Sequence, residues 1–216
     1  MARDALTGKI KIMPEVYLLC SDRLQPEEEA LVQEHMPKRR ERAKAFRRET
    51  DRRNCLAGGL LALRHIPGFR EENLIFLPHG KPALAQKGAP EFNLSHSGNM
   101  VVLAVDQTPV GIDVERMSKE RLSVAERIFS PEEIRWMERT GPSTGFFVLW
   151  TMKESVLKYL GTGFRRDPRN ICLSPFPVQE GFTAYFEKCR IRTVFFGEYM
   201  ISCAAETLWD GHFEEE

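Results

Sequence analysis

WTMKESVLKYLG, residues 150–161, has the pattern of an amphipathic helix that ends at a glycine, but two of its charges do not fit that pattern. At 100° per residue, counted from Phe146, Lys153 falls inside the apolar stripe and Glu154 falls on its edge. The stripe itself holds Phe146, Leu149, Trp150, Met152, Val156, Leu157 and Leu160. Charges against a buried face break the binary pattern, so a specific role is expected for both.

The segment GIDVE, residues 111–115, supplies two further acids in a predicted strand. Asp113 and Glu115 then share one face, about 6.6 Å apart, while Ile112 and Val114 point the other way. At an effective dielectric of about 20, two ionised carboxylates at that distance repel by roughly 2.5 kcal/mol. Solvation at a strand end, protonation of one acid, or a cation between them would relieve the repulsion.

Glu154 is a third acid, placed where an unpaired charge is costly. Three carboxylates that converge from a strand and a helix suit Mg²⁺ or Mn²⁺, which take oxygen ligands and leave positions for water and phosphate. The alternative is an i,i+4 ion pair between Glu154 and Lys158, worth a few tenths of a kcal/mol. That pair leaves Lys153 unexplained, whereas the oxygens of an arriving phosphate would satisfy both the metal ion and Lys153.

Several basic or polar groups could face the same anion. Lys81 lies in HGKP, and Ser95 and His96 lie in LSHSG. Residues 38–53 hold nine Lys or Arg against three acids. This run is either a solvated helix face or a local site for a small polyanion.

The bulk composition restricts the class of protein. The 216 residues allow one large or two small domains, and 31 basic residues balance 31 acidic ones. The zero net charge argues against a general binder of nucleic acid or membrane surfaces. Five widely spaced cysteines without a CxxC favour reduced thiols. Since no apolar run has transmembrane length and no secretory signal is visible, a cytoplasmic protein is expected.

The coarse pattern predicts an α+β fold with two similar-sized lobes, residues 1–115 and 116–216, and an interface between them. Strands are expected at 16–20, 73–84, 101–105, 110–115, 182–189, 192–199 and 200–206, and helices from Pro26, at 37–66, at 120–140 and at 146–160. DQTP, residues 106–109, is expected to turn between two paired strands. No sequence repeat of fixed period is visible.

The motifs GKP at 80, LSHS at 94, GIDVE at 111 and WTMKESVLK at 150 stand in an order that resembles the 4'-phosphopantetheinyl transferases of the surfactin-synthetase-activating type. The resemblance covers nearly the whole chain. It implies two pseudo-symmetric lobes, each a small antiparallel sheet packed with helices, with the active site at their interface. It also implies a monomer that moves the 4'-phosphopantetheine arm of coenzyme A onto a serine of an acyl or peptidyl carrier protein. Adenosine 3',5'-bisphosphate would be released.

Position by position, the resemblance implies roles for individual side chains. Asp113, Glu115 and Glu154 are expected to bind Mg²⁺, with Mn²⁺ possible, against the pyrophosphate, and Lys153 and Lys158 to bind phosphate oxygens. Lys81, Ser95 and His96 are expected to contact the adenosine 3'-phosphate, joined by Arg39 and Arg42, and Arg47 is a further residue expected to bind coenzyme A. Cys55 stands where the family has a threonine, and Arg39 and Arg42 replace lysines, which leaves the exact 3'-phosphate contacts open.

The carrier serine must lose a proton and must reach the cleft. Glu133 aligns with the acid proposed to take the proton, forming a catalytic set with Lys153 and Glu154; neighbouring Glu132 or a metal-bound water are alternatives. Residues 115–129, with exposed basic and apolar side chains, are a hypothetical docking surface, or else an ordinary helix that uses its apolar side chains for the core.

Three rival interpretations remain. SVLK, residues 155–158, matches the SxxK of penicillin-recognising enzymes, but their SDN and KTG partners are absent. A nucleic-acid-binding module would use residues 38–53 but leaves the three acids unexplained. A protein that binds coenzyme A without turnover would keep the same motifs.

Overall fold

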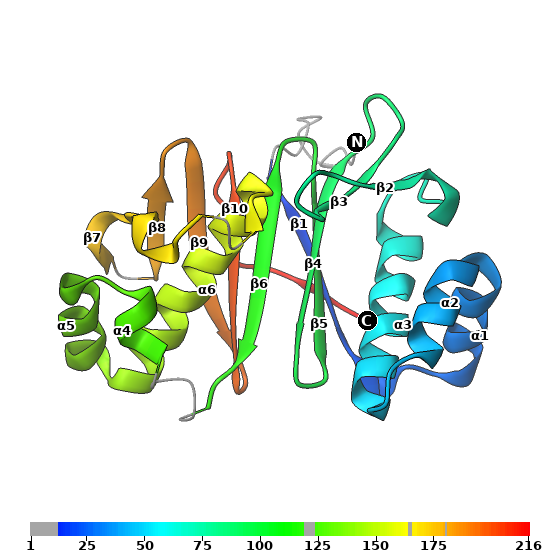
Figure 1. Ribbon diagram of the computed structural model, residues 1–216, viewed down its shortest axis with the longest axis horizontal. Helices are drawn as coiled ribbons and strands as arrows, with labels where there is room; N and C mark the ends of the chain where they lie inside the picture. Colours follow the sequence, from blue (N-terminus) through cyan, green and yellow to red (C-terminus); the bar gives the residue numbers. More distant parts are fainter. Residues whose placement is uncertain (1–12, 119–123, 164–165, 180) are drawn as a thin grey trace, which may run out of the picture.

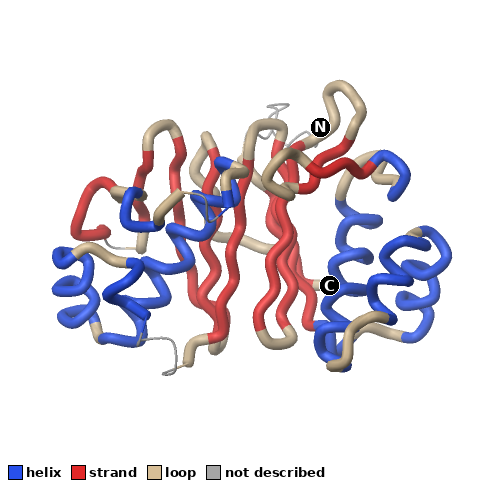
Figure 2. Tube along the Cα trace, viewed as in Figure 1, coloured by secondary structure: helices blue, strands red, loops and turns tan. Residues whose placement is uncertain are grey.

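The computed structural model describes residues 13–118, 124–163, 166–179 and 181–216. Two sheets stand side by side in the middle of the molecule, with helices on both outer sides (Figures 1 and 2). The mixed α+β class is therefore confirmed.

Three strands from the first half of the chain and β11 from its last residues form a sheet of order β11-β1-β5-β4, in which β11 runs parallel to β1 and the other pairs are antiparallel. Its strands are β1 (Glu15–Cys20), β4 (Glu91–Ser97), β5 (Met100–Asp106) and β11 (Glu214–Glu215). Its helices are α1 (Pro26–His35), α2 (Pro37–Lys44) and α3 (Glu49–His65), and a separate hairpin pairs β2 (Leu74–Phe76) with β3 (Pro82–Leu84).

The second half forms an antiparallel sheet of strand order β6-β10-β9-β8-β7. Its strands are β6 (Val110–Arg116), β7 (Ser174–Gln179), β8 (Thr183–Phe186), β9 (Cys189–Phe196) and β10 (Tyr199–Ala205). The helices on its outer side are α4 (Ala125–Ile128), α5 (Pro131–Thr140) and α6 (Pro142–Leu160).

The apolar residues build a layered core because each central strand alternates its side chains between two faces. Tyr17 and Leu19 of β1 join the cluster under α1–α3, whereas Val16 and Leu18 face the other sheet. On β6, Ile112 and Val114 belong to this central cluster. Asp113 and Glu115 therefore share the opposite face, as the alternation predicted.

The helix ends follow their sequence signals. At α1, Pro26 is the first helical residue and the backbone N–H of Gln25 donates to Glu28 at 2.9 Å. At α5, Ser130 accepts from the N–H of Glu133 at 3.2 Å, and its own N–H donates to the Glu133 carboxylate at 2.8 Å. The capping box of α5 thus fixes the position of one predicted catalytic residue.

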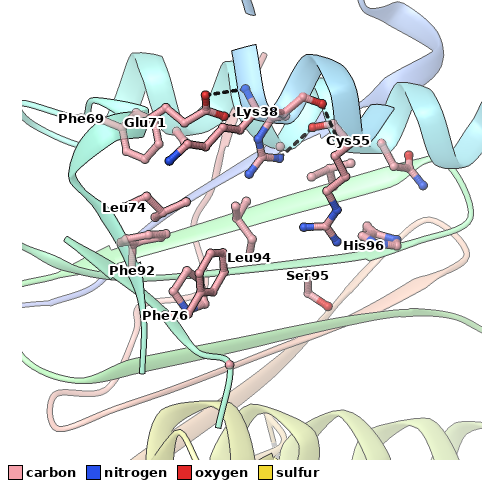
Figure 3. Close-up of a pocket in the computed structure, with 18 of the residues that line it drawn as sticks. Lys38, Cys55, Phe69, Glu71, Leu74, Phe76, Phe92, Leu94, Ser95 and His96 are labelled. Atoms are coloured by element: carbon pink, nitrogen blue, oxygen red, sulfur yellow. Dashed lines mark hydrogen bonds between the residues drawn. The ribbon is translucent and has the colours of Figure 1, made fainter. Parts of the chain in front are cut away.

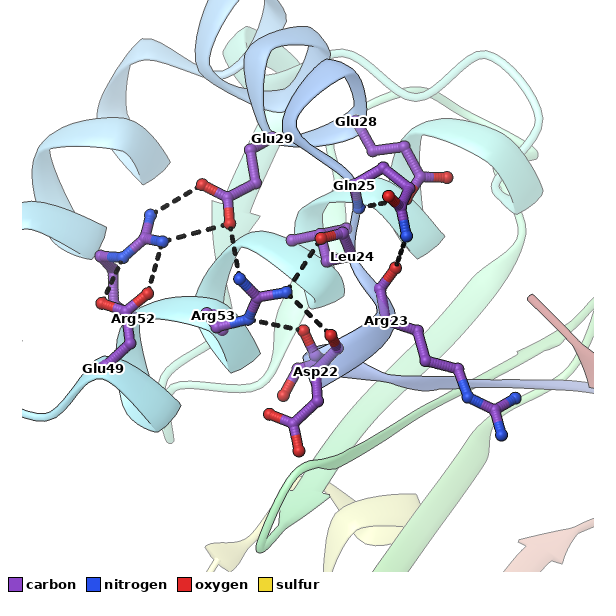
Figure 4. A network of polar contacts seen from close by, with 10 residues as sticks. Asp22, Arg23, Leu24, Gln25, Glu28, Glu29, Glu49, Arg52 and Arg53 are labelled. Carbon is purple, nitrogen blue, oxygen red and sulfur yellow. Dashed lines mark hydrogen bonds and ion pairs between the residues drawn. The ribbon is translucent and has the colours of Figure 1, made fainter.

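Part of the basic run of residues 38–53 serves to hold helices together (Figure 4). Arg52 of α3 donates to Glu29 of α1 and to Glu49. Arg53 donates to the backbone carbonyls of Ser21, Asp22 and Leu24. These contacts weigh against reading the whole run as a polyanion track.

One expectation about the elements was wrong. The strands on either side of DQTP do not pair with each other, because β5 pairs with β1 and β4 while β6 pairs with β10. The helical stretch expected around residues 120–140 consists of two helices, α4 and α5, with Phe129 and Ser130 between them, and residues 119–123 lie outside the described residues. The two sheets divide at residues 107–109. The lobe division after residue 115 stays a prediction.

Candidate functional site

The candidate site lies where β4, β6 and α6 meet. The ammonium of Lys158, on α6, donates to Asp113 Oδ1 on β6 at 2.7 Å and to Ser95 Oγ on β4 at 2.8 Å. The Ser95 hydroxyl also donates to Asp113 Oδ1 at 3.0 Å. Three segments that are distant in the sequence therefore converge on one carboxylate oxygen.

Glu154 joins this group as a poorly satisfied acid. Asp113 Oδ2 and Glu154 Oε1 are both buried, and neither has a hydrogen-bond partner among the described residues. Burial raises the pKa of Asp113, although Lys158 opposes the shift. Burial, followed by the charge of Asp113, raises the pKa of Glu154 to about 7. Two buried acids with unsatisfied oxygens are the environment that a bound cation would stabilise.

Glu115 is better satisfied than its two neighbours. It accepts from Ser97 Oγ at 2.8 Å and from the indole N–H of Trp150 at 3.1 Å. Among the described residues, no three acidic, histidine or cysteine side chains already surround a point where a cation could bind. The donor chemistry nevertheless fits Mg²⁺ or Mn²⁺, because the two unsatisfied oxygens belong to the carboxylates predicted as its ligands.

Lys153 has a partner that the sequence pattern did not indicate. It is fully buried, as its place in the apolar stripe predicted, and its ammonium donates to Glu133 at 2.8 Å and to the Pro168 carbonyl at 2.9 Å. It also lies 5.6 Å from the centre of the Phe129 ring. Burial lowers the pKa of Lys153, and Glu133 opposes that shift. The two charges of the opening motif therefore lie beside different acids, Lys153 beside Glu133 and Glu154 beside Asp113. The phosphate-binding role of Lys153 stays a prediction.

A pocket of about 520 Å³ lies between α2, α3 and strands β2–β5 (Figure 3). Its apolar wall consists of Phe69, Leu74, Phe76, Phe92 and Leu94, and its polar lining includes Lys38, Arg39, Arg42, Ser95 and His96. Four of the five residues predicted to contact the 3'-phosphate thus line one pocket. Partial desolvation in the pocket and then the charge of Lys158 lower the pKa of His96.

Arg39 is held in this pocket by its own contacts. Its guanidinium donates to the Cys55 carbonyl at 2.8 Å, and its backbone N–H donates to the Glu71 carboxylate at 2.7 Å. The Glu71 carboxylate also accepts from the N–H of Lys38, so it caps the N-terminus of α2. A Cβ added at Gly59 would lie 2.6 Å from Arg39 Cδ, which explains the glycine there.

Two other predicted contacts lie elsewhere. The ammonium of Lys81 is buried and donates to the carbonyls of Val110 and Tyr159 at 3.1 and 3.3 Å. Arg47 is exposed in the loop between α2 and α3. Their contacts with coenzyme A remain predictions.

Some residues of the site were missed by sequence reasoning. Ser97 and Trp150 contact Glu115, and Glu71 orients α2, yet none of the three was predicted to act in the site. Trp150 was assigned to the apolar stripe, and that position did not indicate that its indole N–H would donate to an acid. The alternation of LSHS could have indicated Ser97, since Ser95 and Ser97 share a face of β4.

Comparison with known proteins agrees with these motifs. Residues 109–204 match the family model of the 4'-phosphopantetheinyl transferase superfamily. The 4'-phosphopantetheinyl transferase Sfp of Bacillus subtilis (strain 168) is 31% identical over 159 residues, 69% of this chain and 71% of the relative. The chain belongs to the 4'-phosphopantetheinyl transferase superfamily.

Two other relatives match over shorter stretches. A 4'-phosphopantetheinyl transferase of Bacillus subtilis is 33% identical over 145 residues, 63% of this chain and 65% of the relative. The transferase psf-1 of Bacillus pumilus is 41% identical over 136 residues, 58% of this chain and 57% of the relative. These matches thus span less than two thirds of those two relatives. In the part of the chain that the structure describes, no helix is both long and apolar enough to cross a membrane.

Proposed function

We propose that this chain transfers the 4'-phosphopantetheine group of coenzyme A to a serine of an acyl or peptidyl carrier protein, with release of adenosine 3',5'-bisphosphate. The supporting observation is the Ser95 hydroxyl, which lines the pocket and also contacts Lys158 and Asp113. A nucleotide in the pocket would therefore place its phosphates toward the acidic group. Family membership supports the same activity.

Asp113, Glu115 and Glu154 are the proposed ligands of Mg²⁺, or of Mn²⁺. When bound, the cation would neutralise pyrophosphate oxygens and the charge that develops on the leaving phosphate. Asp113 and Glu154 support this assignment because each has a buried oxygen that no protein group satisfies. The cytoplasm, with its divalent cations and reduced thiols, remains the predicted setting.

The basic side chains would bind and orient the anionic substrate. Lys158 would exchange its contact with Asp113 for a phosphate oxygen, while Arg39 and Arg42 would hold the nucleotide end in the pocket. In the reaction, the serine oxygen forms a bond to the phosphorus next to pantetheine as the bond to the bridging oxygen breaks. Positioning and electrostatics would supply most of the acceleration.

Glu133 is the proposed acceptor of the serine proton. Its Oε2 already accepts from the backbone N–H of Ser130 and the ammonium of Lys153, so Oε1 is the proposed proton acceptor. The alternative is that Glu133 only holds Lys153 in place. A Glu133→Gln variant separates the two, because it keeps an acceptor for Lys153 while removing the base.

The carrier surface stays a hypothesis. Of the predicted docking segment 115–129, Arg116 pairs with Glu198 at 3.0 Å, whereas Phe129 is buried in the core. The burial of Phe129 therefore favours the alternative, in which the apolar residues of this segment pack in the core. Residues 119–123, which include Lys119 and Arg121, lie outside the described residues.

The test is incubation of the purified protein with coenzyme A, Mg²⁺ and a panel of apo carrier proteins, read by intact mass. We expect a mass gain of one phosphopantetheine on at least one carrier, and its loss on addition of a chelator. Asp113→Asn and Glu154→Gln should lower the rate at least ~100-fold, whereas Glu138→Gln, at an exposed acid of α5, should not. Full activity of both site variants would refute the cation assignment.

A further inference from the structure

Two serines of β4 contact β6 in the same way, two residues apart. Ser95 Oγ accepts from the N–H of Val114 at 3.4 Å and donates to Asp113 at 3.0 Å. Ser97 Oγ accepts from the N–H of Arg116 at 3.0 Å and donates to Glu115 at 2.8 Å. Each hydroxyl thus binds one backbone N–H of β6 and the carboxylate of the residue before it.

These side chains take the place of a backbone ladder between the two sheets. The backbone of β6 pairs with β10 on one edge. On the other edge, Asn93 accepts from the N–H of Ile112 at 3.0 Å, and the two serines continue the series. The repeat places β4 and β6 in a fixed register across the division between the sheets. Since side chains alternate along a strand, this register fixes where the two acids of β6 lie.

Glu115 receives a second donor from a different element. The indole N–H of Trp150, on α6, donates to Glu115 Oε1, while Ser97 donates to Oε2. Both of these donors are neutral side chains, and each contacts a different oxygen of the carboxylate.

We propose that Ser97 and Trp150 are positioning residues that hold the Glu115 carboxylate ready for a divalent cation. The proposal rests on the cation site of the proposed function. Groups that hydrogen-bond to the ligands of a metal set their orientation, and losing one lowers metal affinity by about 10–100-fold. Two donors from a strand and a helix restrict the carboxylate more than either alone, because rotation about its side-chain bonds must break both contacts.

The direct test is a titration of the purified full chain with Mn²⁺, in which the electron paramagnetic resonance signal of the free ion reports binding. We expect Ser97→Ala and Trp150→Phe each to weaken Mn²⁺ binding ~10-fold. Ser97→Thr, which keeps the hydroxyl and suits a strand, should stay within ~3-fold of the unmodified chain. Trp209→Phe is the matched control, since the indole N–H of Trp209 donates to the His212 carbonyl instead.

Two further readouts separate positioning from loss of fold. Trp150→Phe keeps an aromatic ring against Phe146, whose ring centre lies 6.3 Å away, so its unfolding midpoint without metal should stay near that of Trp209→Phe. In the transfer assay, both variants should raise the Mg²⁺ concentration for half-maximal rate and leave the KM for coenzyme A unchanged.

The outcomes distinguish this proposal from the proposed function. If the unmodified chain binds Mn²⁺ and the variants weaken binding as expected, the positioning role stands even where no carrier is modified. The positioning role is overturned if Ser97→Ala and Trp150→Phe bind Mn²⁺ within twofold of the unmodified chain, or if Ser97→Thr loses as much affinity as Ser97→Ala. It is also overturned if the unmodified chain binds no Mn²⁺ while transferring phosphopantetheine.

Discussion

Ionisation of Glu154 lowers the stability of the folded chain. The carboxylate is buried next to Asp113, and one of its oxygens has no hydrogen-bond partner. Burial and the nearby acid raise its pKa from 4.5 to about 7. The folded state therefore binds this proton more tightly than the unfolded state, so the stability that the protonated form contributes is lost as the pH rises from 4.5 through 7.

Glu154→Gln should accordingly stabilise the metal-free chain in a pH-dependent way. The upper bound is about 3 kcal/mol at pH 8, because one pKa unit corresponds to 1.36 kcal/mol, and the gain should shrink toward zero near pH 4.5. Urea unfolding in the presence of a chelator at both pH values measures it. A variant that is less stable than the unmodified chain at pH 8 would contradict the prediction.

Glu49→Gln provides a control of opposite sign. The hydrogen bond from Arg52 lowers the pKa of Glu49, so its contribution to stability is present above its ordinary pKa and is lost as the pH falls. Removing this exposed acid should slightly destabilise the chain at pH 8 and change little in acid. The two substitutions thus test both the sign and the size of the effect that each pKa shift has on the pH dependence of stability.

The sequence pattern predicted which charged residues of this site are buried, but it did not predict which groups they contact. The helical period placed Lys153 in the buried stripe and Glu154 at its edge, and both are buried. The pattern could not show that Lys153 pairs with Glu133 and not with a neighbour of Glu154, because α5 and α6 meet only through tertiary packing. Periodicity reports which face of an element is buried but does not report what covers that face.

At the scale of elements, α6 and β6 carry five of the predicted site residues and lie in direct contact. A Cβ added at Gly111 would lie 2.1 Å from the Ser155 carbonyl oxygen and 2.3 Å from the Tyr159 nitrogen. Both atoms belong to the helix backbone, which cannot yield as a side chain can. The glycine of GIDVE therefore permits the approach that brings Asp113 within hydrogen-bond distance of Lys158.

Gly111→Ala should therefore separate α6 from β6. We expect a loss of about 3 kcal/mol or more in the free energy of unfolding, since overpacking against backbone is costly. Denaturant unfolding measures the loss. Gly58→Ala is the matched control, because its Cβ would meet only side-chain atoms, of Arg39 at 3.3 Å, Val101 at 3.7 Å and Leu94 at 3.8 Å, and it should stay within about 1 kcal/mol of the unmodified chain. Equal stability of the two variants would contradict this account of the packing.

The strands were easier to predict than the sheets. The β-rich composition located β5 and β6, and alternation oriented Asp113 and Glu115 correctly, but the four-residue DQTP turn suggested a hairpin that does not form. The partner of β6 is β10, whose residues follow much later in the chain. The residues of a strand do not by themselves indicate which other strand it pairs with. The division between the sheets could therefore not be derived from the sequence.

At the scale of the whole molecule, the chain returns to its starting sheet. After β10, Trp209 is buried in the central cluster, and Phe213 packs against Trp209 and Phe196. β11 then adds to the free edge of β1, with Leu18 opposite Glu215. Glu216 finally contacts Arg64 and His65 at the end of α3. Residues 206–216 therefore connect β10 of the second sheet to the β1 edge of the first sheet.

Ending the chain after Asp210 should weaken this connection without removing either sheet. The truncated form retains Trp209 but loses β11, the Phe213 contacts and the Glu216 ion pairs. We expect the thermal midpoint to fall by about 4–8 °C, corresponding to about 2 kcal/mol for a chain of this size. Glu216→Ala, which keeps the strand and removes only the exposed ion pairs, should lower it by at most about 2 °C. If both forms melt at the same temperature as the full chain, the C-terminal segment lies on the first sheet without stabilising it.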